Sequence, residues 1–352
     1  MKKIKWGVIG AGGIALRRTI PEAMRDAHNV ELVSVMDKHA DRARQVADKF
    51  DVPHSCDTEA ELLTQDLDAV YIATPQNIHA RQVIQAAEAG KHILCEKPIA
   101  VSLAEVDQME AAVQKAGVQF MLGLCMRYNV YNQKARDLVQ AGAVGQVVMG
   151  RAQLTCWYPP IASAWRQDLS VSHGGALIDM GTHCLDLLEW IQGSQIVEVA
   201  GFQDLRTHAY RTRIEDTSTI VVRFANGAHG IVDNYFNLPD AAAQNALELH
   251  GTMGSLLATG TIGQDPTGKM STILQPQETG YDPSQVRDVS VVREEYHLEG
   301  VGLYGQMVSM FADCILENKT PPITLEDGRH SVRVVQTIYQ AVQQRRVLSV
   351  PN

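Results

Sequence analysis

A glycine-rich turn near the start of the chain constrains the fold more than any other feature. Residues 10–15 read Gly-Ala-Gly-Gly-Ile-Ala, which fits the pattern G-x-G-x-x-A. The motif follows an apolar run at 4–9 that predicts a strand, and it precedes a segment at 14–25 with helical spacing. Such a turn is typical of the first β-α-β unit of a parallel sheet, so we expect a doubly wound α/β domain here.

The rest of the first third repeats this alternation of strands and helices. We expect strands at 30–36, 69–73, 92–95 and 118–122, and helices at 41–50, 78–89 and 102–116. Gly90 predicts the end of the second of these helices. Ser102, with Glu105 three residues later, predicts a capping box at the start of the third.

The pattern changes beyond about residue 125, where strand-like segments follow one another directly. These segments lie at 147–158, 196–205, 217–224 and 229–236, and Asn226-Gly227 predicts a hairpin between the last two. Helices are expected at 175–191, 304–317 and 326–344, and a long loop or hairpin at 260–285. We therefore predict two domains, an α/β dinucleotide-binding domain at 1–124 and an α+β domain with a large, mostly antiparallel sheet at 125–352.

The composition excludes several classes of protein. Hydrophobic residues make up 45% and charged residues 20% of the 352, which predicts a globular chain. With 31 basic and 40 acidic residues the net charge is -9, and there is no basic block, so we expect no nucleic-acid partner. No apolar stretch approaches the roughly twenty residues that span a bilayer, and the start does not resemble a secretion signal. We expect a cytoplasmic protein with no membrane partner, whose scattered cysteines are reduced and mostly buried.

The glycine turn predicts an anion site. Gly10 permits a tight turn and Gly12 lets the backbone approach a pyrophosphate. The amides that follow, at Gly13 and Ile14, lie at the positive end of the helix. We therefore expect a nicotinamide dinucleotide to bind here.

Asp37 ends the second strand, where the adenine ribose of such a cofactor would lie. Its carboxylate would accept hydrogen bonds from the ribose hydroxyls and repel a 2'-phosphate, which favours NAD over NADP. The structural alternative is an aspartate that turns the chain before the next helix. Lys38 and Arg42 lie nearby and could soften the discrimination, so NADP stays the alternative cofactor.

Two further polar segments follow strands of this domain. Thr74, Pro75, Asn77 and His79 lie in a loop that enters a helix on the cofactor side, although helix capping alone would explain Asn77. Glu96-Lys97-Pro98 ends the strand at 92–95, where a lysine could stabilise negative charge on a substrate oxygen. The alternative there is a surface Glu-Lys pair before a proline turn.

The expected helix at 175–191 begins with a double glycine and carries Asp179 and His183, which are four residues apart and share one face. A histidine can take a proton from an alcohol as hydride leaves, and a carboxylate can orient it. Gly181, between them, indicates that a ligand or a backbone approaches closely. The alternatives are a surface pair or a two-ligand metal site; no third ligand follows at motif spacing, so we expect no metal.

Taken in order, the motifs at 10–15, 74–75, 96–98 and 174–183 resemble the glucose-fructose oxidoreductase and inositol dehydrogenase family. Trp165-Arg166 and residues 250–255 add to the resemblance, which spans nearly the whole chain. The run Trp-Tyr-Pro-Pro at 157–160 is similar to the anhydrofructose reductases of this family, whose usual NADP preference is at odds with Asp37.

The resemblance implies a Rossmann domain, an open-faced sheet domain often used for dimer or tetramer contacts, and an active site between the two. It implies that Lys97 contacts the reacting oxygen, that His183 is the acid/base, and that Asp179 supports it or holds the substrate. Glu96 and Pro98 would shape the nicotinamide side. By similarity, Arg127, Tyr158 and Arg166 contact substrate or nicotinamide.

The expected function is transfer of hydride between the cofactor and a hydroxyl or carbonyl of a sugar, cyclitol or related polyol. Two alternatives stay open: a glycosidase that oxidises its substrate transiently, and a regulator that binds NAD and senses a sugar without chemistry. An exposed sheet face predicts a large apolar patch, and with it a homodimer or homotetramer.

Overall fold

The structure, a computed structural model, describes residues 2–24, 27–275, 283 and 291–351, and the chain forms two compact units. The first unit contains Met1–Tyr128, Ala164–His173 and Val301–Arg333. The second contains Asn129–Ser163, Gly174–Gly300 and Val334–Asn352. The prediction of a single boundary after residue 124 is therefore wrong in part, because two later segments return to the first unit.

Long-range contacts explain why residues 301–333 belong to the first unit. In α8 (Leu303–Glu317), the Phe311 ring meets the edge of Trp6 with 6.0 Å between centroids. Asn29 donates from Nδ2 to the carbonyl of Ser309 at 2.9 Å and to Oδ1 of Asp313 at 2.7 Å. These partners lie about 280 positions apart, so no local sequence pattern could indicate them.

The first unit is built on a six-stranded parallel sheet of order β3-β2-β1-β4-β5-β6. Its strands are β1 (Ile4–Ile9), β2 (Val30–Met36), β3 (His54–Cys56), β4 (Ala69–Ile72), β5 (His92–Glu96) and β6 (Phe120–Gly123). All residues of β4 and nearly all of β1 are buried, as expected of strands covered on both faces. The strand order reverses between β1 and β4, which is where such sheets bind ligands. The doubly wound prediction is confirmed.

The helices of this unit follow the predicted alternation. They are η1 (Ala15–Met24), α1 (Ala40–Phe50), α2 (Glu59–Leu63), η2 (Gln76–Ile78), α3 (His79–Glu88), α4 (Leu103–Ala116), η3 (Cys125–Tyr128), η4 (Trp165–Gln167) and α6 (Leu169–Ser172). The short β3 and α2 had no clear signal in the sequence. η1 has wide π-helical turns around Pro21, whose missing N–H interrupts a regular α-helix. The predicted last residue of that helix, Arg25, lies outside the described residues.

Two predicted helix ends can be checked directly. Gly90 follows α3 with φ 70°, a left-handed value that glycine adopts at little cost. The side chain of Ser102 caps α4 by accepting from the amide of Glu105 at 3.3 Å. The Glu105 carboxylate accepts from the amide of Val101 at 2.9 Å, one residue before the position that a capping box specifies. Ser102 and Gly90 therefore hold their predicted roles.

The second unit contains a nine-stranded sheet of order β14-β13-β12-β11-β7-β10-β9-β8-β15. Only the central β7–β10 pair is parallel among the described strands, so the prediction of a mostly antiparallel sheet is confirmed. The strands are β7 (Val147–Thr155), β8 (Ile196–Asp204), β9 (Thr217–Phe224), β10 (His229–Tyr235), β11 (Ala246–Gly251), β12 (Gly254–Thr259), β13 (Lys269–Leu274), β14 (Val292–Tyr296) and β15 (Leu348–Ser349).

The predicted hairpin joins β9 to β10, and Gly227 in its turn has φ 89°. The predicted excursion at 260–285 contains β13, which pairs with β12; residues 276–282 and 284–285 of that range lie outside the described residues.

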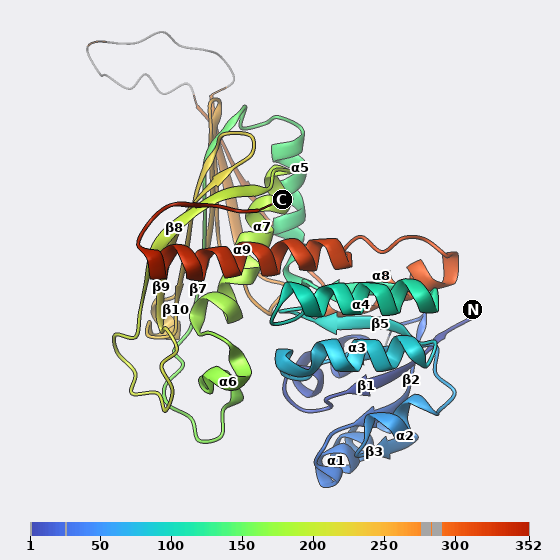
Figure 1. Cartoon of the computed structure of the whole chain (residues 1–352). Coiled ribbons are helices and arrows are strands. Elements are labelled where there is room, and N and C mark those ends of the chain that lie inside the picture. Colours follow the sequence, from blue (N-terminus) through green and yellow to red (C-terminus); the bar gives the residue numbers. More distant parts are fainter. Residues whose placement is uncertain (1, 25–26, 276–282, 284–290, 352) are drawn as a thin grey trace. The chain divides into compact units, whose positions relative to one another are not determined.

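Helices α5 (Val130–Gln140) and α7 (Thr182–Gln192) pack on each other, and α7 packs on β7, so they cover one face of this sheet (Figure 1). The remaining helical segments are η5 (Leu177–Gly181), η6 (Asp240–Ala242) and α9 (Leu325–Gln344), whose residues from Val334 onward belong to this unit. Alternate strand residues such as Ala152, Val232 and Leu249 are buried on the covered face.

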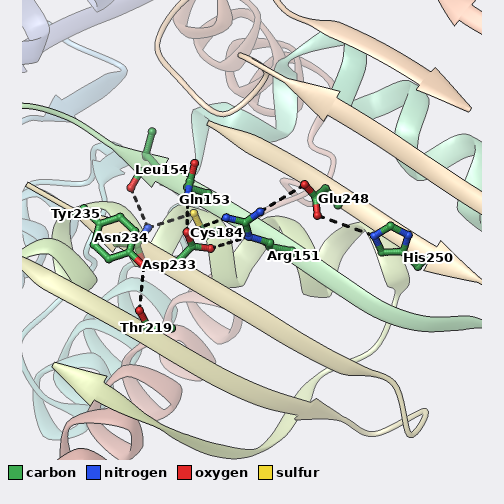
Figure 2. A network of polar contacts seen from close by, with 10 residues as sticks. All are labelled: Arg151, Gln153, Leu154, Cys184, Thr219, Asp233, Asn234, Tyr235, Glu248 and His250. Carbon is green, nitrogen blue, oxygen red and sulfur yellow. Dashed lines mark hydrogen bonds and ion pairs between the residues drawn. The ribbon is translucent and has the colours of Figure 1, made fainter. Parts of the chain in front are cut away.

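The opposite face of the sheet carries a polar network across β10, β7 and β11 (Figure 2). Arg151 forms an ion pair with Asp233 at 3.0 Å and another with Glu248 at 3.5 Å. Further out on the same face, Val221 is 51% exposed and Phe202 is 81% exposed. The prediction of a large apolar patch is therefore wrong at the centre of this face, where charged side chains pair across the strands.

Two remaining predictions concern cysteines and membranes. All six cysteines are free; five are buried and Cys156 is half-buried, as predicted. Among the described residues, no helix combines the length and the apolar character needed to cross a bilayer.

Candidate functional site

The sheet register of the first unit gathers the predicted cofactor residues at one edge. Ile9 lies opposite Met36 on one side and Ile72 on the other, and Ile72 lies opposite Cys95. The next residue along each strand therefore reaches the same carboxyl edge. The residues in this row are Gly10, Asp37, Ala73 and Glu96. The crevice beyond such an edge is where open α/β sheets bind their ligands.

The glycine turn has the geometry that a dinucleotide needs. Gly10 has φ 89°, and a Cβ there would lie 2.9 Å from Cγ2 of Thr74. The amides of Gly10 and Ala11 donate to the carbonyl of Met36 at 2.9 Å, so an anion would meet the amides that follow. At Gly13, with φ 53°, a Cβ would meet nothing within 4 Å, which leaves room at the start of the helix. The loop therefore fits a pyrophosphate.

Asp37 is buried beside this turn. Its carboxylate accepts from the amide of His39 at 3.0 Å and from Nη1 of Arg42 at 3.3 Å. A Cβ on Gly12 would lie 3.4 Å from Oδ2 of Asp37 and 3.1 Å from Cδ of Arg42. Asp37 thus shapes the turn and also holds a carboxylate next to the glycine loop, while Lys38 is exposed.

His79 connects the loops that follow β4 and β5. Its Nε2 lies 2.8 Å from the carbonyl of Thr74 and its Nδ1 lies 2.9 Å from the carbonyl of Pro98. Burial lowers the pKa of His79 below its usual value, an effect that the two carbonyls oppose, and a neutral ring donates to only one of them. Both ring nitrogens face backbone carbonyls, so the geometry supports a positioning role for His79, and the cofactor contact stays a prediction of the sequence.

The other predicted residues of the loop after β4, Thr74, Pro75 and Asn77, have different surroundings. Thr74 donates from Oγ1 to Gln82 Oε1 at 2.5 Å, and Pro75 directly precedes η2. Asn77 is exposed and caps neither η2 nor α3, so the capping explanation is wrong for its side chain. Asn77 is therefore presented to solvent next to the carboxyl edge.

Glu96 is the last residue of β5, and Lys97 follows it in a different environment. Glu96 is buried and accepts from the hydroxyl of Tyr71 at 2.6 Å, so the surface-pair alternative is wrong for it. Burial raises the pKa of the Glu96 carboxyl, an effect that the Tyr71 hydrogen bond and the charges of Lys97 and Arg166 oppose. Lys97 is half-buried and is joined to Pro98 by a cis peptide bond.

The two arginines predicted by similarity both belong to the first unit. Arg127 pairs through Nη2 with Oδ1 of Asp327 at 3.3 Å. The Arg166 guanidinium stacks over the Trp165 ring, 4.4 Å from its centroid, and its charge acts on Glu96. Arg166 is thus part of the electrostatic surroundings of Glu96, and Arg127 is engaged with Asp327.

In the second unit, Asp179 lies in η5 and His183 one turn later in α7, with Asp179 half-buried and His183 6% exposed. The packing around Gly181 leaves no room for a side chain. A Cβ at this position would lie 2.7 Å from Oδ1 of Asn234 on β10 and 2.7 Å from Cδ1 of Leu177. The close neighbour of Gly181 is therefore the sheet's own side chain.

Sequence reasoning missed the residues that anchor this helix. Glu215 Oε1 accepts from the amide of Leu177 at 3.1 Å and from the hydroxyl of Tyr339 at 2.9 Å. A Cβ on Gly174 would collide with the Tyr339 hydroxyl, and one on Gly175 with the Glu215 carbonyl. The double glycine is therefore required by this packing. A carboxylate at a helix N-terminus is also favourable electrostatically.

Tyr158 belongs to an aromatic cluster beyond the end of β7. Its ring lies 5.0 Å from that of Phe236, and its carbonyl accepts from the Tyr210 hydroxyl at 2.5 Å. Trp157 is 45% exposed and meets His208 edge-on at 4.9 Å. The sequence singled out Tyr158 but gave no signal for its distant partners.

The described residues show no group of three or more His, Cys, Asp or Glu side chains that could hold a metal ion. The donor set at the carboxyl edge consists of glycine amides, a carboxylate, an amide side chain and a lysine, which suits a dinucleotide.

Comparisons with known proteins agree with this geometry. Residues 4–124 match the oxidoreductase family with an NAD-binding Rossmann fold, and residues 132–257 match the GFO/IDH/MocA C-terminal domain. The chain belongs to this family, the glucose-fructose oxidoreductase and inositol dehydrogenase family that the motifs indicated. It is thus an oxidoreductase that uses NAD(P).

Three relatives illustrate the similarity. A 1,5-anhydro-D-fructose reductase of Ensifer adhaerens is 28% identical over 96% of each chain. A trans-1,2-dihydrobenzene-1,2-diol dehydrogenase of Mus musculus is 30% identical over 64% of this chain and 67% of its own. A levoglucosan dehydrogenase solved with NADH and levoglucosan has the same fold, with a TM-score of 0.87 and 22% identity over 100% of both chains.

Proposed function

We propose that this protein is an NAD-dependent dehydrogenase or reductase that acts on a CH–OH group of a sugar, cyclitol or related polyol. The observation that carries the proposal is the row of residues at the carboxyl edge of the parallel sheet, where Lys97 directly follows the strand that ends this row. The same row holds the glycine turn and the Asp37 carboxylate.

In this proposal, different residues of the chain bind the cofactor and take part in the reaction. Gly12, Gly13 and Ile14 bind the pyrophosphate, and Asp37 binds the adenine ribose. The Lys97 ammonium donates a hydrogen bond to the reacting oxygen and stabilises the negative charge that develops there. The bound nicotinamide supplies the hydride acceptor or donor.

His183 takes the proton of the hydroxyl during oxidation and returns it during reduction. Asp179, one turn earlier, orients the imidazole or holds a second hydroxyl. Because His183 is buried to 6% exposure, its ring is shielded from bulk water, which favours proton exchange with the bound substrate.

The substrate class rests on the relatives and on the second unit. The names of the three relatives describe dehydrogenases or reductases, two of them for anhydrosugars, which favours net redox chemistry over a glycosidase or a sensor. The partly exposed Trp157 ring offers a flat apolar face of the kind that packs on the C–H surface of a sugar. We therefore propose that Trp157 and Tyr158 contact the substrate.

The test begins with a screen of sugars, anhydrosugars, cyclitols and sugar acids against NAD and NADP, following the absorbance of the reduced nicotinamide. On the substrate found, His183→Asn and Lys97→Ala should each lower kcat by on the order of 10² to 10⁴. NAD affinity should change little, because the glycine turn and Asp37 make most of the proposed cofactor contacts.

The matched control is His297→Asn, which removes an exposed histidine of the second unit that lies outside the sheet strands. It should retain normal turnover. Wild-type turnover in both His183→Asn and Lys97→Ala would show that the catalytic assignment is wrong.

We also propose that the protein assembles as a homodimer or homotetramer through the uncovered face of the nine-stranded sheet. The exposed Phe202 and Val221 side chains on that face support the proposal. The cytoplasmic location and the lack of a nucleic-acid partner stay predictions of the sequence.

A further inference from the structure

A chain of three hydrogen-bonding side chains runs through the interior of the first unit. The hydroxyl of Thr19 donates to the hydroxyl of Tyr71 at 3.0 Å, and the hydroxyl of Tyr71 donates to Oε1 of Glu96 at 2.6 Å. Thr19 and Tyr71 are 0% exposed and Glu96 is 8% exposed. Solvent therefore cannot replace either contact if one partner is removed.

These three hydrogen-bonded side chains join three elements that the proposed function uses. Thr19 lies in η1, the helix that starts at the glycine turn. Tyr71 lies in β4 at the centre of the sheet, and Glu96 is the last residue of β5, directly before Lys97. The helix that follows the proposed pyrophosphate site is thus tied through Tyr71 to the backbone that carries the proposed catalytic lysine.

The surroundings of Glu96 show why this tie matters. Burial raises the pKa of the Glu96 carboxyl, so the apolar surroundings alone favour its neutral form. The Tyr71 hydrogen bond opposes that effect by stabilising the carboxylate. Burial also keeps the neighbouring hydroxyls and thiols neutral. The titratable groups that act on Glu96 are Tyr71, Cys95, Lys97, Cys125, Arg166 and Tyr304.

The backbone opposite leaves little room for Glu96 to move. A Cβ on Gly123, at the end of β6, would lie 3.2 Å from Cα and 3.3 Å from Oε1 of Glu96. The carboxylate therefore lies between the Gly123 backbone and the Tyr71 hydroxyl.

We propose that Tyr71 and Thr19 are positioning residues that hold Glu96 as a fixed carboxylate and so orient the Lys97 ammonium at the carboxyl edge of the sheet. The inference rests on the proposed function for the role of Lys97. The ionisation of Glu96 itself can be tested without any substrate.

The direct test is a pH titration of the Glu96 side-chain carbon by NMR in protein labelled at the glutamate carboxyl, with Glu96→Gln to assign the signal. Tyr71→Phe removes one hydrogen bond to a buried charge, so the midpoint should move upward by about one to two pH units. Thr19→Val should move it in the same direction by a smaller amount, because it weakens Tyr71 as a donor.

The control is Tyr128→Phe, a buried tyrosine of the same unit whose hydroxyl contacts the sulfur of Met121. It should leave the Glu96 midpoint where it is in the wild type. The proposal is overturned if Tyr71→Phe and Thr19→Val both leave the midpoint unchanged, or if Tyr128→Phe moves it as far. If Tyr71→Phe does not fold, the Thr19→Val titration decides.

Kinetics separate positioning from mere packing. On the substrate found by the screen, Tyr71→Phe should move the acid limb of the kcat/KM profile upward with the Glu96 midpoint, and in a Glu96→Gln background it should not move that limb further. An acid limb that stays in place while the midpoint moves would overturn the positioning role. If instead Lys97→Ala kept full turnover, the role that the proposed function gives to Lys97 would fail, while the titration would still measure the hydrogen bonds among Thr19, Tyr71 and Glu96.

Discussion

Replacing Gly181 with alanine tests how the helix of Asp179 and His183 is seated on its sheet. The new methyl carbon would lie 2.7 Å from Oδ1 of Asn234 and 2.7 Å from Cδ1 of Leu177, distances that carbon atoms essentially never adopt. The end of the Leu177 side chain can rotate away. Asn234 cannot do so easily, because its Nδ2 donates to the carbonyl of Leu154 at 3.2 Å and to Sγ of Cys184 at 3.5 Å.

The magnitude follows from two opposing effects. Overpacking a core costs about 1–3 kcal/mol, and the rigid partner places this site in the upper part of that range. Alanine recovers about 1 kcal/mol relative to glycine in a helix. The expected net loss is therefore about 2 kcal/mol, or a fall in Tm of roughly 4–8 °C. Because the start of α7 must shift, kcat should also fall while NAD affinity stays unchanged.

The assay is thermal and urea unfolding, with Gly263→Ala as the matched control in the same unit. A Cβ on Gly263 would meet nothing within 4 Å, so that variant should stay within about 0.5 kcal/mol of the wild type. A Gly181→Ala protein with wild-type stability and lost substrate binding would refute the packing explanation. It would instead support the sequence-based idea that Gly181 lets a ligand approach.

Three further predictions follow from the site. NAD should bind more tightly than NADP. Asp37→Ser should narrow or reverse that preference, because it leaves Arg42 beside the glycine turn. Calorimetric titration with both cofactors measures the two affinities, and tighter NADP binding by the wild type would contradict the prediction. Burial raises the pKa of Glu215 above its ordinary value of 4.5, so its proton is held more tightly in the folded state. The stability of the wild type relative to Glu215→Gln should therefore fall as the pH rises above about 4.5 in urea unfolding, and a constant difference would count against this. Light scattering at micromolar concentration should show a dimer or tetramer that Phe202→Glu weakens, and a monomeric wild type would disprove assembly.

Local patterns predicted most elements of the first unit correctly, because short-range physics determines them. The turn at Gly10 requires a left-handed residue, and Ser102 caps α4 because its side chain accepts the Glu105 amide. The elements without a signal, β3 and α2, are three and five residues long, too short to show a hydrophobic period.

The positions of the candidate site residues in the fold were predictable where these residues follow a strand or begin a helix. Parallel strands end at a common edge, so the sequence could place Asp37 and Lys97 together before their register was known. The sequence did not show which groups surround His79, because the carbonyls of Thr74 and Pro98 reach its ring only in the folded structure.

The sequence by itself determined the glycine turn, the order of strands and helices, the acidic residue at the end of β2, and the motifs that indicate the family. These depend on residues within a few positions of one another, where backbone sterics and hydrophobic periodicity act directly. Only the tertiary structure decided that 164–173 and 301–333 join the first unit and that Glu215 and Tyr339 anchor the helix of His183. Only the tertiary structure also showed that the Tyr71 hydroxyl donates to the Glu96 carboxylate. Those contacts join residues far apart in the chain, and a sequence pattern does not show which distant side chains burial will bring together.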